Sequence, residues 1–346
     1  MTALLFIVIL VGLVVIHEFG HFIVAKASGV KVEEFSVGFG PRLFGFEACG
    51  TLYAFRLFLL GGYVRLYGME PDQPETSESF NQRPLWARVL TIAAGPIMNI
   101  VLAAALFWVL FSGVGITQIV PGPPRIAQLE AGMPAQKAGL RPGDRLLAAN
   151  GKPLPSWNAL LTAVSGSHGK PIRFLVQEGQ VRRTVTLTPK PDKTAQGQLH
   201  IGVLAATQVV HEPLLTGLGM GISQAISACV LLVTAVFGPL LHGRTPPGIS
   251  GVVGIYGYVQ QAEAQGIASV LQLAALLSAN LAVINLVPFP PLDGEKLLLL
   301  FVEWVRRGRR LDPGREAIVN TIGFALLLVL AVVLAYHDVV HMHGTL

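Results

Sequence analysis

Two histidines and one glutamate near the start of the chain have the spacing of a zinc site. His17, Glu18 and His21 form the pattern His-Glu-x-x-His. On a helix the two histidines lie on one face, so both imidazoles can bind the same ion. Glu18 does not need to bind the metal, so it is the candidate general base that takes a proton from a water molecule. The pattern therefore predicts zinc-dependent hydrolysis.

A catalytic zinc ion is usually held by three protein ligands, with a fourth position left for water. Asp293 is the candidate third ligand, because it ends an otherwise uncharged apolar segment in the run Asn-Leu-Val-Pro-Phe-Pro-Pro-Leu-Asp-Gly that begins at Asn285. The three prolines interrupt a helix, and a broken helix at membrane depth is tolerated where it lines an enclosed or water-filled cavity. The other interpretation is that Asp293 caps a helix starting near Glu295.

The segments around these groups are those of a membrane protein. Of the 346 residues, 52% are hydrophobic and 13% are charged, against about 25% charged in soluble domains. Residues 2–25 are nearly all apolar and long enough to span a bilayer, and no Lys or Arg precedes them as in a cleaved signal peptide. Ionisable residues in such a helix are costly, and a bound Zn²⁺ offsets that cost; histidines hydrogen-bonded within a helical bundle are the alternative.

We predict an α-helical polytopic membrane protein with about four transmembrane helices in the lipid bilayer. The spans fall near residues 2–25, 89–111, 268–287 and 318–336. Residues 214–241 are also long and apolar, but a stripe of glycine, serine and glutamine favours an interfacial or re-entrant segment. Lys26, Lys31 and the arginines within 306–310 mark the cytoplasmic side, so we expect residues 116–211 to be extracytoplasmic.

Two regions predict β-structure. Residues 116–211 contain short β-rich runs and one helix near 156–164. Within them, Ala-Gly-Leu-Arg-Pro-Gly-Asp-Arg-Leu-Leu from Ala138 resembles the central motif of PDZ domains, which bind extended peptides; a small β domain without a binding role is the alternative. Residues 57–66 predict a membrane-associated β-hairpin with a turn at Gly61-Gly62. This hairpin either offers a strand edge to an extended substrate or is purely structural.

Taken together, these motifs resemble the site-2 protease family of intramembrane zinc metalloproteases, in particular its bacterial RseP type. The resemblance also covers Gly-Phe-Gly at 38–40, Leu-Gly-Gly-Tyr-Val at 60–64 and Ala-Gly-Pro-Ile-Met-Asn at 94–99. It implies that His17, His21 and Asp293 bind Zn²⁺, that Glu18 is catalytic, and that Asn280 and Asn285 help to position substrate. It further implies cleavage of the transmembrane segments of single-pass membrane proteins, such as anti-sigma factors or remnant signal peptides, in the bacterial inner membrane. Well-known members carry two PDZ domains, whereas this chain has room for one.

The predicted organisation has four parts: residues 1–115 with the His-Glu-x-x-His helix and the hairpin, the PDZ-like domain at 116–211, an interfacial or re-entrant segment at 212–267, and the second half of the membrane core at 268–346. No nucleic-acid partner is expected. A membrane scaffold with a structural metal and a metal transporter are the rival functions. The histidines and aspartate near the C-terminus, from His337 to His343, are interpreted as a solvated end.

Overall fold

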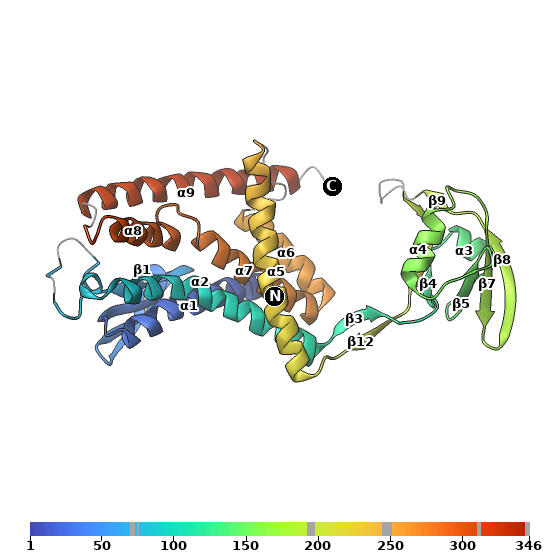
Figure 1. The fold of residues 1–346 in the computed structure, drawn as a ribbon, viewed down its shortest axis with the longest axis horizontal. Coiled ribbons are helices and arrows are strands. Elements are labelled where there is room, and N and C mark those ends of the chain that lie inside the picture. Colours follow the sequence, from blue (N-terminus) through green and yellow to red (C-terminus); the bar gives the residue numbers. More distant parts are fainter. Residues whose placement is uncertain (70–72, 75, 192–197, 244–250, 310–312, 343–346) are drawn as a thin grey trace. The chain divides into compact units, whose positions relative to one another are not determined.

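The computed structural model in Figure 1 describes the chain apart from residues 70–72, 75, 192–197, 244–250, 310–312 and 343–346. The chain forms two compact units. One contains Met1–Val114 together with Glu212–Leu346, and the other contains Gly115–His211. We call them the helical unit and the β-rich unit.

Five helices in the described part of the helical unit are long and apolar enough to cross a membrane. These spans are Thr2–Ala27 in α1, Leu85–Val114 in α2 and the π-helical turn after it, Leu214–Val236 in α5, Ile267–Asn285 in α7, and Glu316–Val340 in α9. The helices themselves cover Thr2–Ala27 (α1), Leu85–Trp108 (α2), Leu214–Leu241 (α5), Val252–Gln265 (α6), Ile267–Asn285 (α7), Asp293–Val305 (α8) and Pro313–Met342 (α9). The predicted number of four crossings therefore depends on α5 alone, and it stays a prediction.

Helices α1 and α2 approach each other so closely that only glycine fits between them. A Cβ atom built at Gly20 of α1 would lie 2.3 Å from the carbonyl oxygen of Ala94 on α2. Backbones in such contact hold two helices at a fixed separation, because no side chain can be repacked between them. This contact lies between His17 and His21 along α1, so it sets the position of α2 against both histidines.

Strands β1 (Val32–Ala48) and β2 (Thr51–Leu66) form one curved sheet beside α1. Both strands bend, so that Phe35 near the start of β1 lies opposite Tyr53 on one side and Val64 on the other. The sheet therefore has four segments, in the order 62–66, 32–37, 51–55 and 42–48. The predicted hairpin turn at Gly61-Gly62 is wrong, because these glycines lie inside β2 and the turn falls at Cys49-Gly50, where both residues have positive φ.

The glycine pair has a packing role in place of the predicted turn. A Cβ atom at Gly62 would lie 2.7 Å from the carbonyl oxygen of Ser36 on the neighbouring segment and 3.5 Å from Cγ of Glu18 on α1. Gly62 thus lets the edge segment 62–66 approach α1 at the level of the glutamate. Apolar runs around a Gly-Gly pair fit a turn and a close approach equally well, so the pattern alone could not separate the two.

The β-rich unit is built on a four-stranded antiparallel sheet in the order β6-β5-β7-β8. The unit also contains the strand pairs β3–β12, β4–β11 and β9–β10. Helix α4 (Trp157–Ser165) lies where a helix near 156–164 was predicted, and the Ser156 hydroxyl caps its start. The strands are Ile116–Ile119 (β3), Ile126–Leu129 (β4), Arg145–Ala149 (β5), Lys152–Pro153 (β6), Ile172–Glu178 (β7), Val181–Leu187 (β8), Lys190–Pro191 (β9), Leu199–His200 (β10), Val203–Ala205 (β11) and Thr207–Val210 (β12); a short helix, α3, covers Pro134–Lys137. Buried Leu146, Leu160 and Phe174 join α4 to the sheet in one apolar core.

Candidate metal centre

Three buried side chains from distant parts of the sequence converge in the helical unit. His17 Nε2 and His21 Nε2 lie 3.2 Å apart, and they lie 3.1 and 3.2 Å from Oδ2 of Asp293. Ligands at about 2.0–2.1 Å from a tetrahedral zinc ion are separated by roughly 3.3 Å. The three atoms therefore form a triangle of the size that one zinc ion requires. Among the described residues, this is the one group of three such side chains that could hold a metal ion.

The carboxylate oxygen that faces the histidines fits a cation better than a hydrogen bond. Oδ2 of Asp293 is buried, and no donor reaches it with the geometry of a hydrogen bond, although both Nε2 atoms are near. A buried acceptor without a partner costs about 1–3 kcal/mol or more when it is charged. A metal ion between the oxygen and the two nitrogens satisfies all three atoms, so this set of residues fits zinc.

Helix α8 places Asp293 at the start of its first turn. Leu292 occupies the N-cap position, and no side chain makes a capping hydrogen bond, so the alternative role of Asp293 as a cap is not observed. Gly294 has to be glycine, because a Cβ atom there would lie 2.3 Å from the Val287 carbonyl oxygen and 2.4 Å from that of Leu286. The loop that carries the three prolines thus packs directly on the backbone of α8 beside the aspartate.

Helix α2 contacts the far side of both histidine rings. Nδ1 of His21 lies 2.9 Å from the Thr91 carbonyl oxygen, which can only accept, so Nδ1 carries the proton and Nε2 keeps its lone pair. Nδ1 of His17 lies 3.2 Å from the side-chain amide of Asn99. Thr91 and Asn99 were not predicted from the sequence as partners of the histidines. For Asn99, the available signal was an asparagine inside an apolar span.

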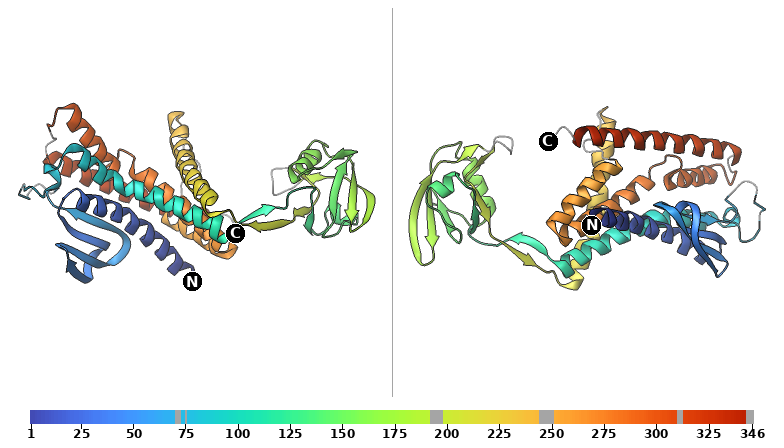
Figure 2. Two further views of the ribbon diagram at one scale, coloured as in Figure 1. Left: turned by 60° about the horizontal axis from the view of Figure 1, so that its bottom comes forward. Right: turned by 180° about the vertical axis from the view of Figure 1, so that it is seen from behind.

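Glu18 is half-buried and lies between the two histidines along α1. Its Cγ is the atom that a Cβ at Gly62 would approach, so the carboxylate-bearing side chain is next to the edge segment 62–66 of β2. Figure 2 shows the sheet lying along α1. The candidate base therefore has the histidines on one side and an open strand edge on the other.

The two predicted substrate-positioning residues both lie on α7. Asn280 and Asn285 are half-buried, and Asn285 is the last residue of the helix. In the described part of the chain no hydrogen bond joins either amide to His17, His21 or Asp293, so their role stays a prediction. Helix α7 does contact Asn99, the residue beside His17, because Ser278 Oγ donates to the Asn99 backbone carbonyl oxygen at 2.8 Å.

The predicted solvated C-terminal end is wrong for Asp338, whereas His337 is exposed as predicted. Asp338 is buried, and its Oδ2 accepts a hydrogen bond of 2.8 Å from the Gly254 N–H in the first turn of α6. Helix α9 continues past it to Met342, and His343 lies outside the described residues. An aspartate that accepts from a free N–H group at a helix start stabilises that helix, which gives this polar residue in an apolar segment a structural role.

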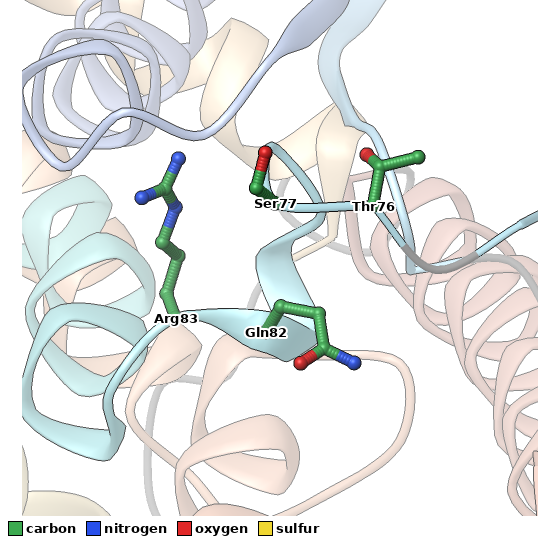
Figure 3. A pocket seen from close by; sticks show the side chains of 4 residues that line it. All are labelled: Thr76, Ser77, Gln82 and Arg83. Atoms are coloured by element: carbon green, nitrogen blue, oxygen red, sulfur yellow. The ribbon is translucent and has the colours of Figure 1, made fainter.

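A separate polar pocket of about 600 Å³ is lined by Thr76, Ser77, Gln82 and Arg83, between the β-sheet and the start of α2 (Figure 3). None of these residues belongs to the group of three. The Arg83 guanidinium donates to the Gly29 carbonyl just beyond the end of α1. Arg83 therefore joins the end of α1 to the start of α2.

Comparison with known proteins shows the family of the chain. The model of Peptidase family M50 matches residues 5–330. The chain is 29% identical to zinc metalloprotease RasP of Bacillus licheniformis and 28% identical to the regulator of sigma-W protease RasP of Bacillus subtilis, in both cases over 98% of each chain. Over 26% of its length it is similar to a solved PDZ domain of an SdrC-like protein from Listeria innocua, with 20% identity and a TM-score of 0.23. A family match over nearly the whole chain shows that the protein belongs to Peptidase family M50, the site-2 protease family of zinc metalloproteases.

Proposed function

We propose that this zinc metalloprotease cleaves the transmembrane segments of single-pass membrane proteins, with His17, His21 and Asp293 as zinc ligands and Glu18 as general base. The observation that carries the proposal is that two of the three buried ligands lie within α1, a helix long enough to span a bilayer. A site built on such a helix meets peptide bonds that lie within the membrane.

The chemistry divides between the metal and the chain. Zinc held by the three side chains supplies a Lewis acid that lowers the pKa of water and polarises a carbonyl group. Glu18 takes the proton from the attacking water and returns it to the leaving amide nitrogen. Its half-buried position leaves it open to water and substrate, as a general base must be.

The substrate must reach the site in extended form, because an intact helix hides its carbonyl groups in internal hydrogen bonds. We propose that the edge segment 62–66 of β2 binds the unwound substrate as an added strand. In the described sheet this segment pairs on one side with residues 32–37, and Gly62 lies beside Glu18. A strand added there runs past the general base. Asn280 and Asn285 then contact the substrate from α7.

The natural substrates in this proposal are anti-sigma factors or remnant signal peptides of a bacterial inner membrane. One relative is named a regulator of sigma-W protease, which supports the first class. The β-rich unit, with its PDZ-like sequence, selects substrates from the extracytoplasmic side. It contains none of the proposed zinc ligands or the general base, so its removal leaves cleavage of a short transmembrane peptide intact.

The test is Glu18→Gln in the purified full chain in detergent, with a model transmembrane peptide as substrate. We expect cleavage to fall by at least about two orders of magnitude, since the base is lost, while zinc content stays at the wild-type level. Loss of zinc from this variant would contradict the assigned role of Glu18. Zinc flux into vesicles without peptide cleavage would support the transporter. Absence of both zinc flux and cleavage would support the scaffold.

A further inference from the structure

We infer that Asn99 is a positioning residue that orients His17 for zinc by accepting a hydrogen bond from its ring N–H. The Asn99 side chain is completely buried on α2, and its amide lies 3.2 Å from Nδ1 of His17. The other amide atom, Oδ1, is also buried and has no hydrogen-bond partner. This inference rests on the proposed role of His17 as a zinc ligand.

The chemistry of a histidine ligand determines which amide atom must face the ring. Nε2 of His17 points at His21 and Asp293, so a metal ion there takes the Nε2 lone pair and leaves the proton on Nδ1. An Asn99 NH₂ group facing the ring would then meet an N–H group, donor against donor, while Oδ1 stays unpaired. The oxygen and nitrogen of an amide have nearly the same shape, so a half-turn of the amide exchanges them. That exchange pairs the buried oxygen with the Nδ1–H and removes the contact between two donors.

The surroundings of Asn99 hold it in place for this contact. Ser278 Oγ on α7 donates to the Asn99 backbone carbonyl at 2.8 Å, and Ser278 is itself fully buried. Thr91, two helical turns earlier on α2, offers its backbone carbonyl to Nδ1 of His21. Helix α2 therefore supplies one acceptor to each histidine. Of the two, the contact to His17 is the one made by a side chain, so a substitution can remove it.

The experiment compares Asn99→Leu with Asn99→Asp in the full chain, using zinc affinity from competition with a chelator as the readout. Leucine has a similar volume and cannot accept a hydrogen bond, so we expect zinc to bind about 10–100-fold more weakly. Aspartate accepts from the Nδ1–H and is expected to stay within about threefold of the wild type. Ser112→Ala on the same span is the matched control, because Ser112 Oγ is also buried without a partner and no change in affinity is expected.

Equal weakening in the leucine and aspartate variants would overturn the inference, because it would indicate a packing role. Wild-type affinity in Asn99→Leu would overturn it as well. Thermal unfolding of the metal-free proteins checks folding, and Asn99→Ala replaces the leucine variant if the latter does not fold. His17→Ala in the same assay separates this inference from the proposed function: retention of zinc in that variant would remove His17 from the site itself.

Discussion

At the scale of single residues, Gly95 on α2 makes the metal centre possible by having no side chain. A Cβ atom at this position would lie 2.3 Å from Nε2 of His21 and 2.9 Å from Cε1 of His17. Nδ1 of each ring contacts α2, at Thr91 for His21 and at Asn99 for His17, so neither ring can move aside without losing that contact. We predict that Gly95→Ala lowers zinc affinity by at least about tenfold, measured as zinc content after dialysis against a chelator.

Gly113→Ala is the control for this prediction. It lies on the same span, and a Cβ atom there would meet only the Val109 side chain at an ordinary 3.7 Å. Both changes add the same methyl group to a glycine of this span, so the comparison tests the contact with the histidines. Wild-type zinc content in Gly95→Ala would show that the rings can be displaced without loss of the metal.

At the scale of elements, α8 is tied to α2 by a buried ion pair outside the metal centre. Arg88 makes two hydrogen bonds to the Glu303 carboxylate, at 2.7 and 2.8 Å, and both side chains are mostly buried. Removing one partner of a buried pair typically costs about 3–5 kcal/mol. Because α8 carries Asp293 at its other end, we predict that Arg88→Leu lowers both the melting temperature and the zinc affinity.

The double variant Arg88→Leu with Glu303→Leu should recover part of both losses, since it removes the uncompensated carboxylate. Arg141→Leu is the matched control, because Arg141 pairs with Glu178 at 2.8 Å on an exposed surface. A pair of that kind contributes less than about 1 kcal/mol. If Arg88→Leu melted at the same temperature as Arg141→Leu, the buried pair would not hold α8.

The sequence predicted local features better than long-range ones. The histidine helix, the broken segment before Asp293 and the zinc metalloprotease activity followed from motifs, and the family match confirms the activity. The pairing of Arg88 with Glu303 joins residues 215 positions apart, and no local pattern indicates it. The turn at Cys49-Gly50 was missed for a related reason, because a strand that bends to pair on both sides has no signature in its alternation of side chains.

At the scale of the whole molecule, the path of α5 decides the number of crossings. Helix α5 begins beside the end of α2, where Trp108 Nε1 donates to the Leu214 carbonyl at 2.9 Å. The first turn of the next helix, α6, contacts Asp338. Asp338 lies near the end of α9 that is farther along the chain from the arginines within 306–310. Figure 1 shows α5 running across the direction of α2 and α9. If the orientation predicted from the sequence holds, these contacts favour an α5 that starts and finishes on one side of the membrane, the extracytoplasmic one.

We predict that single cysteines introduced as Gly243→Cys and Gln265→Cys both react with an impermeant thiol reagent added from outside. Both positions are exposed; Gly243 follows the end of α5, and Gln265 is the last residue of α6. The native cysteines, Cys49 and Cys229, are replaced by serine in the background. Labelling of the Gly243→Cys protein only after the membrane is opened would show that α5 crosses, which gives five spans.

The proposed zinc ligands are far apart in the sequence, and this has a consequence for biosynthesis. His17 and His21 enter the membrane with α1, whereas Asp293 follows 272 residues after His21. The metal centre is therefore incomplete until α8 has been made. A newly inserted α1 with its histidines and glutamate cannot cut neighbouring membrane proteins during that time, so proteolytic activity begins only after α8 has joined the helical unit.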